Sequence, residues 1–173
     1  RQTMDHLVKY EHDLLKLTAS MERRGVLIDV DYSVSLAEEM TAYEADNIAV
    51  VKSFGVNNHN ATRDVAQALQ NLGVKLIETT ASGQLKVDKT ILSNIANDES
   101  LGDARKLAEA VTNAKNNAKW RDAYVIASLE SMDDKGRVHP KLNSLQARTG
   151  RMSISNPPLQ QLPSGGDAIR RMF

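Results

Sequence analysis

Up to about residue 132, apolar and polar positions alternate along the chain with the period of an α-helix. Apolar residues recur every three to four positions over 3–24, and again over 36–51, which predicts two amphipathic helices. Residues 26–30, between these helices, form a short extended stretch. Asp31 or Ser33 is expected to cap the second helix, because both side chains can accept a bond from a free backbone N–H group.

Further helices are predicted in the middle of the chain. Asn60 is expected to cap a helix over 61–72, and Asp88 to cap a shorter one. Residues 74–87 lack helical periodicity and predict a loop. The longest helical pattern extends over 101–132 and contains no proline.

The pattern changes near residue 135. Residues 137–142 alternate with a period of two, which is typical of a strand, and every proline lies at or after Pro140. Aromatic residues make up only 4% of the chain, which disfavours an aromatic-rich sheet. We therefore expect a mainly α fold with a small antiparallel β and loop segment at the C-terminus.

Composition narrows the class of protein. The absence of cysteine excludes disulfides and thiol chemistry. Apolar runs stay far below the ~20 residues that span a bilayer, so a soluble protein without a membrane partner is expected. His6 and His12 are six positions apart and face opposite sides of a helix, and adjacent acidic pairs such as Asp133 and Asp134 diverge. No metal site is therefore predicted.

Net charge is zero only when summed over the whole chain. Residues 1–100 carry 10 basic and 15 acidic side chains, whereas residues 101–173 carry 12 and 7. Residues 135–173 carry seven Lys or Arg and only one acid, Asp167. A basic segment of this kind is typical of proteins that bind nucleic acid, and it also fits a solvated surface.

The basic C-terminal segment is also rich in side chains that can bond to base edges and phosphates. Its amide and guanidinium groups belong to Asn143, Gln146, Arg148, Arg151, Asn156, Gln160 and Gln161, and its hydroxyls include Thr149, Ser153 and Ser155. From composition alone, a nucleic-acid contact and an ordinary polar loop both remain open.

One stretch of this segment matches a specific pattern. TGRMSISNPPLQQLP at 149–163 resembles the T-G-R-L-S-S-x-x-P-N-L-Q-N-I-P motif of family A DNA polymerases, and IRRMF at 169–173 is similar to the I-R-x-x-F that follows it. Segments upstream resemble further family motifs in the same order, so the likeness covers nearly the whole chain. These segments are 21–32, 57–69, 82–92, 119–124 and 135–143.

The resemblance implies a division into subdomains. Residues 1–30 would be a helix and strand leading into the palm, 31–131 the helical thumb, and 132–173 the first part of the palm. The family's metal-binding aspartates lie beyond the position equivalent to Phe173. We therefore expect no catalytic residue and no cofactor in this chain, two magnesium ions in the full-length polymerase, and no polymerisation by the chain alone.

The resemblance also implies which palm residues contact DNA. Arg151 matches an arginine that enters the minor groove at the primer terminus, and Gln160 matches a minor-groove glutamine beside it. Gln161 stands where the family has asparagine. Three further positions match residues close to the primer-template: Asn143, Thr149 and Ser153.

In the thumb, Lys115, Lys119 and Tyr124 match helix contacts to the DNA backbone, and Asn60 matches the asparagine that opens the thumb-tip helix. Lys86 replaces a serine of the family motif and could hold a phosphate by charge. The implied partners are primer-template DNA and the remaining palm and fingers of the polymerase.

The chain also departs from the bacterial pattern. Pro158 replaces a family asparagine, and the interval between Pro163 and Ile169 is short, which favours a phage-like member. The implied location is the cytoplasm of a bacterial or phage-infected cell.

Two alternatives stay open: a stand-alone, non-catalytic duplex-binding module, and a structural helical domain with a solvated basic end. Without the remaining palm, Leu159, Leu162 and Ile169 are expected to be exposed, and residues 140–173 to be disordered or to pair with a second copy.

Overall fold

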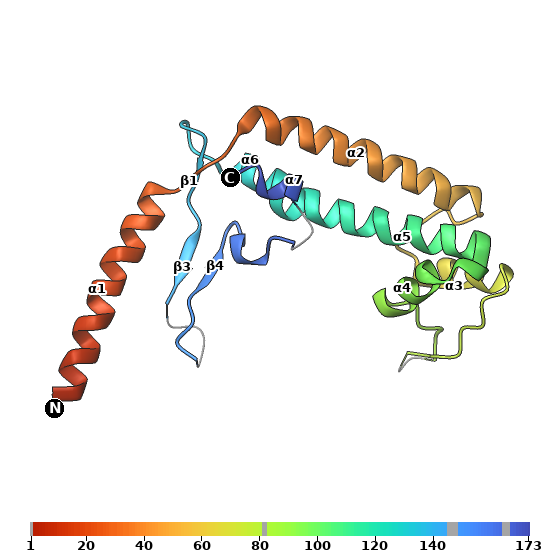
Figure 1. Cartoon of the computed structure of the whole chain (residues 1–173), viewed down its shortest axis with the longest axis horizontal. Coiled ribbons are helices and arrows are strands. Elements are labelled where there is room, and N and C mark those ends of the chain that lie inside the picture. Colours follow the sequence, from red (N-terminus) through yellow and green to blue (C-terminus); the bar gives the residue numbers. More distant parts are fainter. Residues whose placement is uncertain (1, 81–82, 145–148, 164–166) are drawn as a thin grey trace. The chain divides into compact units, whose positions relative to one another are not determined.

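The computed structural model describes residues 2–80, 83–144, 149–163 and 167–173 (Figure 1). Most of these residues are helical, and short antiparallel strands occur near the C-terminus, which confirms the predicted fold class. The chain divides into two compact units: unit 1 comprises residues 1–37 and 121–173, and unit 2 comprises residues 38–120. The subdomain boundaries at 30/31 and 131/132 stay a prediction.

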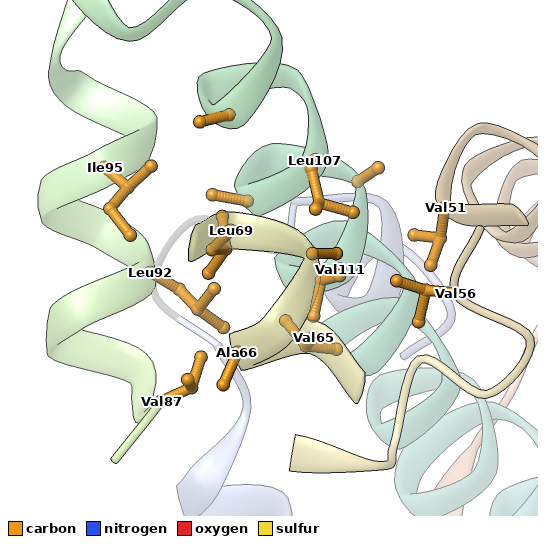
Figure 2. Packing of buried hydrophobic residues seen from close by; sticks show 14 residues of the cluster. Val51, Val56, Val65, Ala66, Leu69, Val87, Leu92, Ile95, Leu107 and Val111 are labelled. Atoms are coloured by element: carbon orange, nitrogen blue, oxygen red, sulfur yellow. The ribbon is translucent and has the colours of Figure 1, made fainter. Parts of the chain in front are cut away.

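Unit 2 is helical. Its elements are the later turns of α2 (Val30–Ser53), α3 (Thr62–Asn71), α4 (Lys89–Asn97), the 3₁₀ turn η1 (Glu99–Leu101) and α5 (Gly102–Trp120). α4 packs along α5 (Figure 1). Figure 2 shows the aliphatic core between them, in which Leu69, Leu107 and Val111 are fully buried. Alanines of α5 complete the core and let the neighbouring helices approach closely, and the partly buried Phe54 packs against the cluster.

The helix starts in unit 2 were only partly predicted. The Asp88 carboxylate accepts a bond from the Ile91 N–H at 2.9 Å, which confirms the predicted cap of α4. The Asn60 cap was wrong, because α3 begins at Thr62 after Ala61 and no side chain caps it. Asn60 lies in a turn in which its own N–H donates to Asn58 Oδ1 at 2.9 Å, and this turn delays the helix.

Unit 1 combines helices at its edges with two short strand pairs. Its elements are α1 (Gln2–Arg24), β1 (Val26–Leu27), the first turns of α2, the π-helical segment η2 (Arg121–Ile126), α6 (Ala127–Ser131), β2 (Arg137–Val138), β3 (Lys141–Asn143), β4 (Ser153–Ser155), the 3₁₀ turn η3 (Leu159–Gln161) and α7 (Asp167–Arg170). β1 pairs antiparallel with β2, and β3 with β4. Pro140 separates β2 from β3 and divides the predicted strand over 137–142, because proline cannot donate to a ladder.

The start of α2 differs from the sequence prediction. α2 begins at Val30, and the Asp29 carboxylate accepts a bond from the Tyr32 N–H at 3.0 Å. Asp31 lies within the first turn, and the buried Ser33 hydroxyl donates to the Asp29 carbonyl. The predicted caps Asp31 and Ser33 were therefore wrong, because the helix starts one residue earlier than Asp31.

The long helical pattern over 101–132 contains an interruption. α5 ends at Trp120, and η2 winds more widely before α6 resumes the α-helix. Tyr124 and Val125 of η2 are both buried. A wider turn changes which residues face inward, and such segments frequently occur at functional sites.

The C-terminal residues are packed within unit 1. Ile169 and Met172 are only 2% and 1% exposed, and the Asp29 N–H donates to the Met172 carbonyl at 2.8 Å. The Tyr32 hydroxyl donates to the Ala168 carbonyl at 3.0 Å. The expectation that Ile169 would be exposed was therefore wrong, because residues 167–173 are bonded to Asp29 and Tyr32 and Ile169 is buried.

The apolar face of α1 has little cover within the described chain. Met4 is 66% exposed and Leu7 53%, whereas Thr18 is buried. Among the described residues, no helix is both long enough and apolar enough to span a membrane.

Candidate nucleic-acid interface

β3 and β4 form a two-stranded ribbon that carries two of the predicted contact residues. Asn143 lies directly opposite Ser153, and Leu142 lies opposite Ile154. Asn143 and Ser153 are both half-buried. The Asn143 Nδ2 donates to the Ser155 hydroxyl at 3.4 Å, so this amide also crosses between the strands.

Both outer edges of the ribbon are closed by side chains. The Leu142 N–H donates to Glu22 Oε1 of α1 at 2.6 Å, and the Ile154 N–H donates to Gln160 Oε1 at 3.2 Å. Gln160 Nε2 donates to the Met152 carbonyl at 3.2 Å. The amide predicted to reach the minor groove is therefore bonded at one end to β4 and at the other to Met152, the residue before β4.

Tyr124 and Gln161 are brought together although they lie far apart in sequence. The Tyr124 hydroxyl donates to the Gln161 carbonyl at 2.7 Å, and the Tyr124 side chain is only 6% exposed. The Gln161 side chain is exposed. Tyr124, predicted to contact the DNA backbone, thus uses its hydroxyl to hold η3.

The approach to β4 presents exposed polar groups. Thr149 and Arg151 are exposed, and they flank Gly150, whose φ of 70° lies in the left-handed region that favours glycine. This turn places a hydroxyl and a guanidinium group next to the ribbon. Both groups suit phosphate oxygens and base acceptors.

Helix α5 carries the two predicted lysines of unit 2, one turn apart. Lys119 is exposed, whereas Lys115 is half-buried, and burial lowers the pKa of Lys115 below its usual value. Lys115 lines a small cavity of about 120 Å³ with Asp88 and Thr112. The Thr112 hydroxyl is buried and has no hydrogen-bond partner within the described part of the chain.

Asn60 is exposed and directly follows His59, whose pKa is influenced by the charge of Lys115. Burial lowers the pKa of His59, and the charge of Lys115 lowers it further. The turn that carries Asn60 therefore lies close to the Lys115 end of α5.

Lys86 is already paired with carboxylates. Its ammonium lies 2.9 Å from Glu78 Oε2 and 3.0 Å from Asp88 Oδ2, and these bonds raise the pKa of Lys86. The same Asp88 caps α4. A phosphate at Lys86 would have to compete with both acids.

Sequence reasoning missed a bridge made by His139. Its Nδ1 lies 2.7 Å from the Glu22 carbonyl and its Nε2 lies 3.1 Å from Asp133 Oδ2. Bonds to both of these acceptors raise the pKa of His139. A carbonyl and a carboxylate can only accept, so the bridge is complete when both ring nitrogens carry a proton. The sequence distance between the partners hid this bridge.

No metal centre emerges from the residues that the structure describes. Within 2–80, 83–144, 149–163 and 167–173, no group of three or more His, Asp or Glu side chains is arranged to hold an ion. The site is therefore a set of donors and cations without a metal-binding cluster.

The chain is similar to proteins of one family. A model of DNA polymerase family A matches residues 30–173. The DNA polymerase of Mycobacterium phage D29 is 40% identical over 171 residues, which cover 96% of this chain and 27% of that protein. DNA polymerase I of Synechocystis is 29% identical, over 96% of this chain and 17% of its own length.

Structural comparison gives the same result for the fold. The polymerase domain of Pol1 from M. smegmatis, in a complex with DNA primer-template and dNTP, superposes with a TM-score of 0.76 at 22% sequence identity. The match covers 94% of this chain and 28% of that one. The chain thus spans about a quarter of the length of the phage relative and of this structural neighbour.

Proposed function

The chain belongs to DNA polymerase family A, and from this premise we propose that it is the part of a DNA-directed DNA polymerase that grips primer-template DNA. Template-directed nucleotidyl transfer would belong to the complete polymerase. The observation that carries the proposal is the ribbon next to an exposed Arg151, within a C-terminal segment that has seven basic residues and one acid.

In unit 1, we assign the minor-groove and nearby contacts to the ribbon and its flanks. Arg151 and Gln161 supply exposed donors for the acceptors that every correct base pair presents in the minor groove. Asn143, Thr149 and Ser153 supply neutral donors to sugars or phosphates. Grip of this kind does not depend on base sequence.

In unit 2, we assign phosphate contacts to Lys119 and Lys115, with Asn60 as a neutral donor. Lysine contacts to phosphates release counterions, so this part of the affinity should fall steeply with salt. Lys86 joins them only if DNA displaces Glu78 or Asp88 from its ammonium.

The catalytic metals are proposed to lie elsewhere in the polymerase. Two magnesium ions held by carboxylates would stabilise the attacking and leaving oxygens. The described residues do not fit such a site, because they contain no cluster of suitable ligands. The remaining palm and fingers are therefore the proposed partners, in a bacterial or phage-infected cell.

A binding experiment tests the proposal. The 173-residue chain is titrated into fluorescently labelled primer-template DNA at several salt concentrations, and anisotropy gives Kd. We expect binding with a negative salt slope, and Lys119→Ala to reduce the slope by about one. Lys75→Ala removes an exposed lysine of the same unit outside the proposed contact set, and serves as the matched control.

The outcomes separate the three hypotheses. Absence of binding would favour the structural domain. Binding by the chain without primer extension by the full-length gene product in Mg²⁺ would favour a stand-alone duplex-binding module. Extension by the full-length product that is slowed by Arg151→Ala would support the polymerase.

A further inference from the structure

We propose that Gln160 is a positioning residue: its amide clamps the β4 backbone and thereby orients Arg151, and Tyr124 holds the clamp in place from η2. The inference rests on the proposed DNA-gripping function and replaces the direct DNA contact predicted for these two side chains. Hydrogen bonds within unit 1 thus connect the buried Tyr124, through Gln160, to the backbone beside the exposed Arg151.

The first step is the amide itself. Gln160 Oε1 accepts from the Ile154 N–H and Gln160 Nε2 donates to the Met152 carbonyl, both at 3.2 Å. Two bonds at opposite ends of a planar group fix both its position and its rotation. The amide cannot turn toward a base edge without losing both bonds.

The second step concerns the outward-facing N–H group of β4, which requires an acceptor. In an antiparallel pair of residues without mutual hydrogen bonds, both N–H groups point away from the partner strand. Leu142 and Ile154 form such a pair, since each N–H donates to a side chain instead. Among the described residues, β3 and β4 are the strands of this sheet, and the Gln160 amide bonds to the edge of β4 where a further strand could pair.

The third step is how Gln160 is held. The Gln161 N–H donates to the Pro158 carbonyl at 2.9 Å, which is the spacing of a 3₁₀ turn. The Leu159 N–H donates to the Pro157 carbonyl, also at 2.9 Å, at the start of η3. The Tyr124 hydroxyl then fixes the Gln161 carbonyl at 2.7 Å. Tyr124 is buried, and the carbonyl that it binds lies one residue from Gln160.

The consequence falls on Arg151. The Met152 carbonyl that accepts the Gln160 bond lies in the peptide plane between Met152 and Ser153. This plane begins one residue after Arg151, so the clamp restrains the backbone that directly follows the arginine. Positioning residues of this kind act by reducing the freedom of a contact group before it binds.

The first experiment needs no DNA. Amide hydrogen exchange of Ile154 is measured by NMR in the 173-residue chain. Gln160→Ala should speed this exchange about fivefold, the equivalent of one ordinary hydrogen bond. Gln160→Glu keeps an acceptor for the Ile154 N–H and should stay within about twofold of the original rate.

Gln161→Ala, which removes a neighbouring amide whose side chain is exposed, is the matched control and should leave the exchange rate of Ile154 unchanged. An unchanged rate in Gln160→Ala overturns the clamp whatever the DNA results.

The second experiment is a double-mutant cycle on primer-template Kd with Gln160→Ala and Arg151→Ala. If Gln160 acts through Arg151, its removal should weaken binding in the original chain and change Kd by less than about twofold once Arg151 is gone. Additive losses would mean that Gln160 contacts DNA itself and would overturn the inference. If even the original chain fails to bind DNA, the proposed function and the positioning role built on it both fall, and the exchange rates still decide whether the clamp exists.

Discussion

Leu142 and Ile154 face each other across the β3–β4 ribbon, and the outward N–H group of each is bound by a side chain from another segment of unit 1. Glu22 binds the first and Gln160 the second. A two-stranded ribbon has two open edges and is marginal by itself. These two side chains are therefore expected to stabilise the ribbon.

Glu22→Ala should destabilise unit 1. It leaves the partly buried Leu142 N–H without its acceptor, which costs about 1–3 kcal/mol. Glu22→Gln keeps an acceptor oxygen but removes the charge from the hydrogen bond. Its free energy of unfolding should therefore fall by less than that of Glu22→Ala. Urea unfolding followed by circular dichroism measures both values. Glu38→Ala, an exposed acid on α2, is the control, and an equal loss there would contradict the assignment.

The His139 bridge predicts a pH dependence of stability. Its bonds to the Glu22 carbonyl and then to Asp133 raise the folded-state pKa of His139 above its usual value near 6.5. The stabilisation is therefore fully present below the unfolded-state pKa and is lost as pH rises through the higher folded-state pKa. The unfolding free energy should fall across that window in the original chain.

His139→Gln should flatten this fall in the unfolding free energy. His12→Gln, which removes an exposed histidine of α1, is the control and should leave the fall in place. His59 acts in the opposite direction, because burial lowers its pKa, so the difference between the original chain and His139→Gln isolates the bridge. A fall of the same size in both proteins would contradict the prediction.

Gly25 should not tolerate a side chain. Its φ is 63°, and a Cβ atom there would lie 2.7 Å from the Val138 carbonyl oxygen and 2.9 Å from the His139 ring. Gly73→Ala is a matched control, because its φ is 89° and nothing lies within 4 Å of its Cβ position. Gly73→Ala should lower the free energy of unfolding by only the ~1–2 kcal/mol that a side chain costs in the left-handed region. Gly25→Ala should lower the free energy of unfolding by more. Equal unfolding midpoints for the two variants would contradict this reasoning.

Sequence periodicity was sufficient for the helical part of the fold. The pattern of apolar positions predicted the helices α3, α4 and α5, because a 3.6-residue repeat depends on local spacing. Helix starts were less certain. Asp88 caps α4 as predicted, whereas neighbouring turn residues displaced the predicted starts at Asn60 and Asp31.

The candidate site was predicted only as a set of residues. Sequence motifs identified Gln160 and Tyr124, but no motif shows that the first bonds to β4 and the second to the Gln161 carbonyl. Glu22 and His139 were missed as functional support because the bonds of the Glu22 carbonyl and carboxylate reach residues more than a hundred positions away along the chain. Such contacts follow from tertiary packing, which local patterns do not contain.

Tyr124→Phe should separate packing from hydrogen bonding. Phenylalanine keeps the buried ring, so the core should remain intact, while the Gln161 carbonyl loses its donor at a cost of about 1 kcal/mol. DNA affinity should fall although the residue is buried. Tyr43→Phe, an exposed tyrosine of α2, is the control for loss of a hydroxyl. Unchanged stability and affinity in Tyr124→Phe would argue against its role in holding η3.

Arg151→Ala should affect extension more than binding in the full-length polymerase. Arg151 is exposed and follows the left-handed turn at Gly150. In the proposed function Arg151 meets the primer terminus, whereas Lys119 makes a phosphate contact that would stay the same throughout the reaction. An interaction that forms on binding and strengthens in the transition state lowers both affinity and rate when it is lost, and the rate more, while uniform binding changes Kd alone. Single-turnover extension rates and Kd values for Arg151→Ala and Lys119→Ala measure this difference.

We expect a larger loss of rate than of affinity for Arg151→Ala, greatest on matched primer termini, and mainly a loss of affinity for Lys119→Ala. Equal losses of rate and affinity for Arg151→Ala would place Arg151 among the general grip contacts instead.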